Sequence, residues 1–146
     1  MTDTLKGRLR EDLNGARRER DKLRTMVLTT TLSELKNREI ELGREAEETD
    51  VVDVVNRAVK RRREAAEQMR AGGREELALK EEQEAVLLMA YLPRGLTEAE
   101  VRALARAAVA DGADSVGAVM SRLMPAIKGR FDGREANRIA REELGA

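Results

Sequence analysis

Cysteine and histidine are both absent from the 146 residues of this sequence. A disulfide, a thiolate nucleophile, an imidazole base and a zinc site built from Cys or His are therefore excluded. Carboxylates, lysines, hydroxyls and Tyr91 remain as reactive groups. Glutamates are so frequent that neighbours such as Glu81, Glu82 and Glu84 carry no catalytic signal without an apolar pocket to shift their pKa. We expect a protein that is not an enzyme and that needs no cofactor or metal.

Aromatic residues and proline are also scarce. Aromatics make up 1% of the chain and only two prolines occur, whereas charged residues reach 38%, against about 25% in ordinary domains. A core of Leu, Val, Ala and Met inside long charged segments is typical of an all-α protein. No apolar run approaches the roughly 20 residues of a membrane span, and the N-terminus lacks the apolar run of a signal peptide. We therefore expect a cytoplasmic protein without a membrane partner.

The clearest boundary lies around Pro93. Proline disfavours helix at the residue before it, so an incoming helix is expected to stop near Leu92. Thr97 and Glu100 then have the spacing of a capping box, which begins a new helix. The sequence upstream predicts long charged helices, and the sequence downstream predicts short alanine-rich ones. We expect an N-terminal helical domain over residues 1–92, with about four helices arranged as a long-helix hairpin domain, and a C-terminal three-helix bundle over residues 96–146.

Two helices are predicted at the start of the chain. Apolar residues at spacings of four, four and three form one helical stripe, made of Leu5, Leu9, Leu13 and Ala16. Asp21 is a suitable cap for a second helix, and Gly43 is a suitable residue to end it. We favour an antiparallel hairpin here, and one unbroken helix is the alternative.

A third and a fourth helix should pack on each other. Asp50 is the expected cap of the third helix, and Gly72 follows its end. Arg62 interrupts its apolar seam, which we expect to be open to solvent there; the seam consists of Val52, Val55, Val59, Ala66 and Met69. The fourth helix, over residues 74–92, is expected to present these residues to the third: Leu77, Ala78, Ala85, Leu88, Met89 and Leu92.

Three shorter helices are predicted after Pro93. Thr97, Ser115 and Asp132 are their expected caps. The residues predicted to face inward include Val101, Leu104, Val119, Leu123, Met124, Ile127, Ala136 and Ile139.

Positive charge is uneven although the net charge is +0. Between Arg122 and Arg141 six basic residues face two acidic ones, a balance of +4, and residues 45–50 form an acidic counterpart. The run Lys60-Arg61-Arg62-Arg63 resembles a nucleic-acid patch, but a helix distributes four consecutive residues around its circumference. We interpret that run as a solvated helix face.

The loop before the last helix is the best candidate site. Its glycines, Gly129 and Gly133, bracket basic residues directly before a helix N-terminus, where free N–H groups favour a phosphate. A plain helix–helix turn is an equally good interpretation, and a capping Asp132 would compete with an anion for the same N–H groups. The residues that we predict to contact nucleic acid are Lys128, Gly129, Arg130, Gly133, Arg134 and Arg138.

Four segments together resemble the YqeY family of small bacterial proteins. They are Lys-Asn-Arg-Glu-Ile-Glu at 36–41, Ala-Gly-Gly-Arg-Glu-Glu-Leu-Ala at 71–78, Tyr-Leu-Pro at 91–93 and Leu-Met-Pro-Ala-Ile-Lys-Gly-Arg-Phe-Asp-Gly at 123–133. Their order and spacing make the resemblance specific, although Phe131 departs from the smaller residue usual at that place. The family is similar to the C-terminal tail of one of the subunits of the aspartyl/glutamyl-tRNA amidotransferase, and a similar module is found on some glutaminyl-tRNA synthetases.

The resemblance implies a helical N-terminal domain, a three-helix C-terminal domain and an association with tRNA. The amide-transfer chemistry belongs to other domains of the amidotransferase, so a carbon–nitrogen ligase label would be inherited from the family name. We expect a non-catalytic RNA-binding module for tRNA, or for a tRNA-charging or amidotransferase complex, that uses the basic C-terminal bundle. A helical protein-interaction adaptor is the alternative, because aromatics for base stacking are scarce and the seam at Arg62 is expected to be open.

Overall fold

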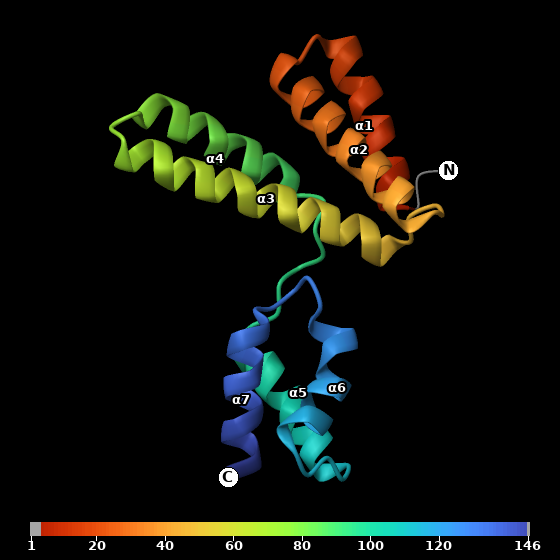
Figure 1. The fold of residues 1–146 in the computed structure, drawn as a ribbon, viewed down its shortest axis with the longest axis vertical. Coiled ribbons are helices and arrows are strands. Elements are labelled where there is room, and N and C mark those ends of the chain that lie inside the picture. Colours follow the sequence, from red (N-terminus) through yellow and green to blue (C-terminus); the bar gives the residue numbers. More distant parts are fainter. Residues whose placement is uncertain (1–3, 146) are drawn as a thin grey trace. The chain divides into compact units, whose positions relative to one another are not determined.

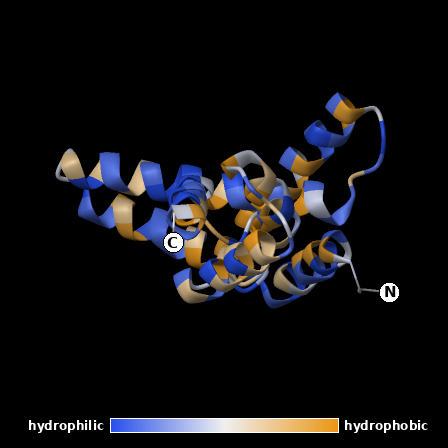
Figure 2. Cartoon of the chain, turned by 90° about the horizontal axis from the view of Figure 1, so that it is seen from below, coloured by the Kyte–Doolittle hydropathy of each residue, from blue (hydrophilic) through white to orange (hydrophobic). Residues whose placement is uncertain are grey.

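A computed structural model describes residues 4–145 of the chain. Within that range the chain forms seven α-helices and no strand, which confirms the all-α prediction (Figure 1). Residue contacts divide the chain into two compact units, and the division falls between Leu92 and Pro93. The helices carry hydrophobic residues interspersed with hydrophilic ones (Figure 2). In the described part of the chain, no helix has the length and apolar character needed to cross a membrane.

The N-terminal unit begins with α1 (Leu5–Glu19) and α2 (Lys22–Leu42), which lie side by side (Figure 1). The first two predicted segments are thus two helices and not one unbroken helix. The chain breaks at Arg20, which adopts the left-handed conformation with φ 56°. Asp21 caps α2 as predicted, because its carboxylate accepts a hydrogen bond from the N–H of Arg24 at 3.1 Å.

The third helix, α3 (Glu48–Ala71), does not begin at the predicted cap. Glu47 is the capping residue, and Asp50 lies in the first helical turn, where its carboxylate accepts the N–H of Glu47 at 2.9 Å. The segment contains several acidic residues three apart, so the pattern fits more than one capping box. The hydrogen bond from Glu47 and the nearby Arg44 guanidinium lower the pKa of Asp50.

The predicted open seam at Arg62 is closed by α4 (Glu75–Met89). The Arg62 side chain is only 12% exposed, and its Nε lies 3.8 Å from the buried Glu84 carboxylate. Leu77 and Met89, predicted to face inward, are instead 44% and 41% exposed. A residue one position away on a helix points about 100° elsewhere, and α4 turns the face of Ala78, Ala85 and Leu88 toward the core, leaving those neighbours outside.

The C-terminal unit consists of α5 (Glu98–Ala110), α6 (Val116–Ile127) and α7 (Gly133–Gly145), which share one apolar core. The three predicted caps are confirmed: Thr97, Ser115 and Asp132 each accept a backbone N–H at 3.1 Å. Leu104 and Met124 were predicted inward and are 37% and 41% exposed. The largest fully buried side chains are Val101, Val119, Leu123, Ile127 and Ile139.

Tyr91, the single tyrosine, is buried in the core of the N-terminal unit. Its hydroxyl donates to Asp12 at 2.5 Å, and the Arg8 guanidinium lies 5.3 Å from the ring centroid. Burial, followed by the hydrogen bond to Asp12, raises the pKa of the Tyr91 phenol to about 12.

We expect the tyrosinate absorbance of the native protein to rise near pH 12, against about 10 for the unfolded chain. Because the pKa is raised by folding, the stabilisation from Tyr91 is fully present below about pH 10 and is lost as the pH passes through 12. A titration of the folded protein beside one in concentrated urea measures both values. Equal midpoints would contradict the burial of this hydroxyl.

Candidate nucleic-acid interface

The predicted anion loop is a turn in which most backbone donors are already used. The N–H groups of Arg130 and Phe131 both donate to the Ile127 carbonyl, at 2.8 and 3.0 Å. The capping carboxylate of Asp132 accepts from Glu135 at 3.1 Å, as the competing interpretation required. At the first turn of α7, the N–H groups of Gly133 and Arg134 have no acceptor among residues 4–145. The backbone N–H groups that remain for binding an anion are therefore those of the first turn of α7.

Arg130 is held inside the C-terminal unit by its own side chain. Its Nε donates to the Arg94 carbonyl at 2.8 Å and its Nη1 to the Ala126 carbonyl at 3.4 Å. The Leu96 N–H in turn donates to the Arg130 carbonyl at 2.9 Å. These bonds tie the loop to the segment after Pro93. The first role of Arg130 is therefore structural, which the sequence pattern did not indicate.

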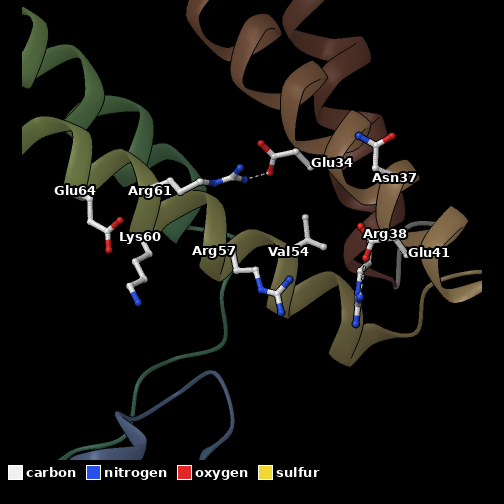
Figure 3. Close-up of a pocket in the computed structure, with 9 residues that line it drawn as sticks. All are labelled: Glu34, Asn37, Arg38, Glu41, Val54, Arg57, Lys60, Arg61 and Glu64. Carbon is white, nitrogen blue, oxygen red and sulfur yellow. Dashed lines mark hydrogen bonds and ion pairs between the residues drawn. The ribbon is translucent and has the colours of Figure 1, made fainter.

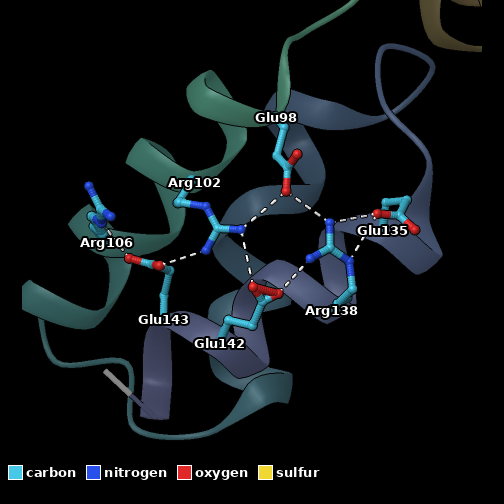
Figure 4. Close-up of polar contacts among 7 residues, drawn as sticks. All are labelled: Glu98, Arg102, Arg106, Glu135, Arg138, Glu142 and Glu143. Atoms are coloured by element: carbon cyan, nitrogen blue, oxygen red, sulfur yellow. Dashed lines mark hydrogen bonds and ion pairs between the residues drawn. The ribbon is translucent and has the colours of Figure 1, made fainter.

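Arg138 is also engaged, at the centre of an ion-pair network between α5 and α7 (Figure 4). Its guanidinium contacts Glu98 at 2.8 Å, Glu135 at 2.8 Å and Glu142 at 2.5 Å. Three acidic partners leave little of its charge for an external ligand. Arg138, one of the predicted contact residues, is therefore placed against carboxylates and is not grouped with the cations of the loop before α7.

The rest of this network surrounds Glu143, a buried carboxylate on α7. Arg102 contacts Glu143 at 2.8 Å, and Arg106 pairs with its other oxygen (Figure 4). Arg102 and then Arg106 lower the pKa of Glu143, and Arg138 and then Arg102 lower that of Glu98. Three arginines and four glutamates make up the network, which therefore carries a net negative charge.

The predicted excess of +4 is therefore largely neutralised within the unit. That count ends at Arg141, immediately before Glu142 and Glu143. From Pro93 onward the sequence has nine basic and eight acidic residues, a balance of +1. Arg122 also pairs with Asp111 at 2.8 Å. Among the predicted site residues, Lys128 is exposed, and Arg134 is exposed and has no side-chain partner in the described part of the chain.

The basic run at 60–63, interpreted from the sequence as a solvated helix face, is solvated only in part, because Arg62 is nearly buried. Lys60 is exposed, Arg62 is turned toward Glu84, and Arg63 contacts the Met89 sulfur. Arg61 reaches from α3 to Glu34 on α2 at 2.5 Å (Figure 3). These two helices border a groove of about 460 Å³. The charged residues of the groove are of both signs: Arg38, Arg57, Lys60 and Arg61, with Glu34, Glu41 and Glu64.

A group of cations at the α1–α2 turn was not predicted from the sequence to be a binding surface. Arg17, Arg18, Arg20 and Lys22 are all exposed, and none has a side-chain partner within residues 4–145. The available signal was five basic residues in the eight positions from Arg17 to Arg24, against two acidic ones. The sequence pattern there indicated only a polar connection between two helices, because its caps and polar residues account for the chain reversal.

In the described part of the chain, no group of three or more His, Cys, Asp or Glu residues is arranged to hold a metal ion. A comparison with proteins of curated function gives no match. A family model described as Yqey-like protein matches residues 6–144, which is nearly the whole sequence. The match agrees with the resemblance carried by the four segments, and the chain therefore belongs to the YqeY-like family.

Proposed function

We propose that this protein is a non-catalytic RNA-binding module whose ligand is tRNA, alone or within a tRNA-charging or amidotransferase complex. In the proposed architecture, an N-terminal long-helix hairpin domain is followed by a three-helix C-terminal bundle that contacts the RNA with its basic residues. A cytoplasmic location is part of the proposal, because tRNA and its enzymes are there. The similarity of the family to the amidotransferase tail supports this ligand.

One observation in the structure supports the RNA surface more than any other. At the start of α7, the exposed Arg134 side chain adjoins the N–H groups of Gly133 and Arg134 that have no acceptor in the described residues. N–H groups at a helix N-terminus and a guanidinium are both strong phosphate ligands. Arg141 lies seven residues on, two helical turns along the same face, and is likewise exposed. Arg134 and Arg141 are therefore the cations most available to RNA phosphates on α7.

Reversing both charges, Arg134→Glu with Arg141→Glu, is expected to weaken tRNA binding at least tenfold. Each lost phosphate contact should reduce the slope of log affinity against log salt by about 0.7 to 0.9. Exposed side chains without partners contribute within about 0.5 kcal/mol to stability, so the melting temperature should hardly change. Fluorescence anisotropy of labelled tRNA at several salt concentrations measures both the affinity and the slope.

The matched control is Arg57→Glu with Lys60→Glu, two exposed cations on α3 that also lack side-chain partners in the described residues. It introduces the same charge change and should lower affinity only through the general field. A wild-type protein that does not bind tRNA at low salt would refute the proposal. Equal effects of the two pairs would refute the assignment to α7.

A protein-interaction adaptor is the second candidate function, and exposed apolar residues on α4 favour it. Leu77, Leu79, Val86 and Met89 are between 41% and 66% exposed. Partners captured from lysate that disappear after nuclease treatment support the RNA function. Partners that resist nuclease, but are lost in a Val86→Lys variant, support the adaptor.

A further inference from the structure

Within residues 4–145, the α1–α2 turn gathers four cations that have no side-chain partner. We define the basic turn as Arg17, Arg18, Arg20 and Lys22, all exposed. Both acidic residues of this segment are already engaged with Arg24. Glu19 pairs with its guanidinium at 3.4 Å, and Asp21 accepts its backbone N–H at 3.1 Å. The four cations of the basic turn therefore keep their charge available for an external anion.

The stability of α1 and α2 accounts for the positions of only two of these four cations. Arg17 and Arg18 lie in the last turn of α1, where the negative end of the helix dipole favours cations. Lys22 is the first residue of α2, where the positive end of the dipole disfavours a cation. A lysine at that position is thus unfavourable for the helix that contains it.

Arg20 also adopts a backbone conformation that residues other than glycine disfavour. It is the one non-glycine residue in the described chain with a positive φ, whereas the other positive values, between 68° and 104°, belong to Gly43, Gly73, Gly112 and Gly129. Gly43 has the same role at the end of α2 that Arg20 has at the end of α1. Non-glycine residues in this conformation are disfavoured and occur where another constraint retains them. We attribute the presence of arginine here, in place of glycine, to its charge.

The surface between these cations fits a sugar–phosphate chain. Arg17, Arg20 and Lys22 border a shallow hollow of about 460 Å³, together with Thr25 and the 42% exposed Met26. Cations around a small apolar floor can contact phosphates and a ribose at once. Aromatic rings for base stacking do not border it, so contacts to the RNA backbone are favoured over base recognition.

We propose that the basic turn is an RNA phosphate-contact surface on the N-terminal unit, acting independently of nucleotide sequence. This inference rests on the proposed RNA function and adds a second surface to it. The opposite charges of the turn and of phosphate supply the affinity, and counterion release makes it salt-dependent. The surface should serve tRNA and a mixed-sequence RNA duplex alike.

The test uses the full-length protein and two probes, labelled tRNA and a labelled mixed-sequence RNA duplex. A triple variant, Arg17→Gln, Arg20→Gly and Lys22→Gln, should weaken binding of both probes at least tenfold and reduce the salt slope by about 2 to 3. The control triple variant, Arg57→Gln, Lys60→Gln and Arg74→Gln, removes the same charge from exposed positions elsewhere in the unit. It should change affinity severalfold less.

The single variant Arg20→Gly separates a binding role from a structural one. Glycine relieves the left-handed backbone, so the melting temperature should stay constant or rise, while RNA affinity falls and the slope decreases by about 0.7 to 0.9. A lower melting temperature with unchanged affinity would overturn the inference.

The outcomes distinguish this inference from the proposed function. If the turn variants bind normally and the Arg134 and Arg141 reversals do not, the basic turn is wrong and the proposed surface stands. The reverse result upholds the basic turn and rejects the surface on α7. A wild-type protein that binds neither probe at low salt overturns both.

Discussion

Replacing Ile139 by alanine is expected to lower the free energy of unfolding of the C-terminal unit by about 2 to 5 kcal/mol. Ile139 is fully buried on α7, in the core shared with α5 and α6. The unit from Pro93 to the end of the chain has 54 residues. A domain of that size is stable by only about 3 to 8 kcal/mol, at 0.05 to 0.15 kcal/mol per residue. The cavity therefore removes a large share of its stability, and the unfolded fraction of the unit should rise.

Urea unfolding followed by circular dichroism measures this loss. The control is Leu104→Ala on α5, a residue that the sequence also placed inward but that is 37% exposed. It should cost less than about 1 kcal/mol, because its side chain is already partly in solvent and its removal leaves no closed cavity. Tyr91, in the core of the N-terminal unit, should keep its high pKa in the Ile139 variant. Similar costs for the two alanine variants would contradict the assigned core.

Replacing Arg62 by methionine is expected to destabilise the N-terminal unit by about 3 to 5 kcal/mol, because it leaves the buried Glu84 carboxylate without the guanidinium that pairs with it. The Glu84 side chain is 7% exposed. Burial, followed by repulsion from Glu81, already raises the pKa of Glu84, and Arg62 acts in the opposite direction. A carboxyl whose pKa is raised by folding favours the folded state most at low pH. The Arg62→Met variant should therefore recover stability as the pH falls.

The double variant, Arg62→Met with Glu84→Met, should by contrast equal the wild type or exceed it by about 1 to 4 kcal/mol. The wild-type pair is poorly matched: the two groups lie 3.8 Å apart, and the buried Arg62 Nε has no hydrogen-bond partner within the described residues. Urea unfolding of the wild type, both single variants and the double variant completes a mutant cycle. Lys60→Met, on an exposed face of the same helix, is the control and should stay within about 0.5 kcal/mol. An Arg62→Met variant with the same free energy of unfolding as the wild type would show that the Glu84 carboxylate is solvated.

The sequence by itself determined the helical class and most helix ends. Caps depend on residues three positions apart, so Asp21, Thr97, Ser115 and Asp132 could be identified without the tertiary structure. The one misplaced cap, Asp50, lies in an acidic segment where two local patterns compete. The family could also be recognised, because the order of short segments along a chain is itself a sequence property.

Only the tertiary structure decided which charges remain available. Arg138 is paired with Glu98, forty positions away, and Arg130 with the Arg94 carbonyl, thirty-six positions away. The count of +4 stopped one residue before Glu142 and could not include a partner as distant as Glu98, so the predicted basic bundle contains neutralised arginines. The excess of cations at the α1–α2 turn was visible in the sequence, but their lack of partners in the described residues was not. The same holds for the closed seam at Arg62, because a helix can turn any of several faces toward its neighbour. Charge availability and burial are properties of packing between elements, whereas capping and periodicity are properties of neighbouring residues.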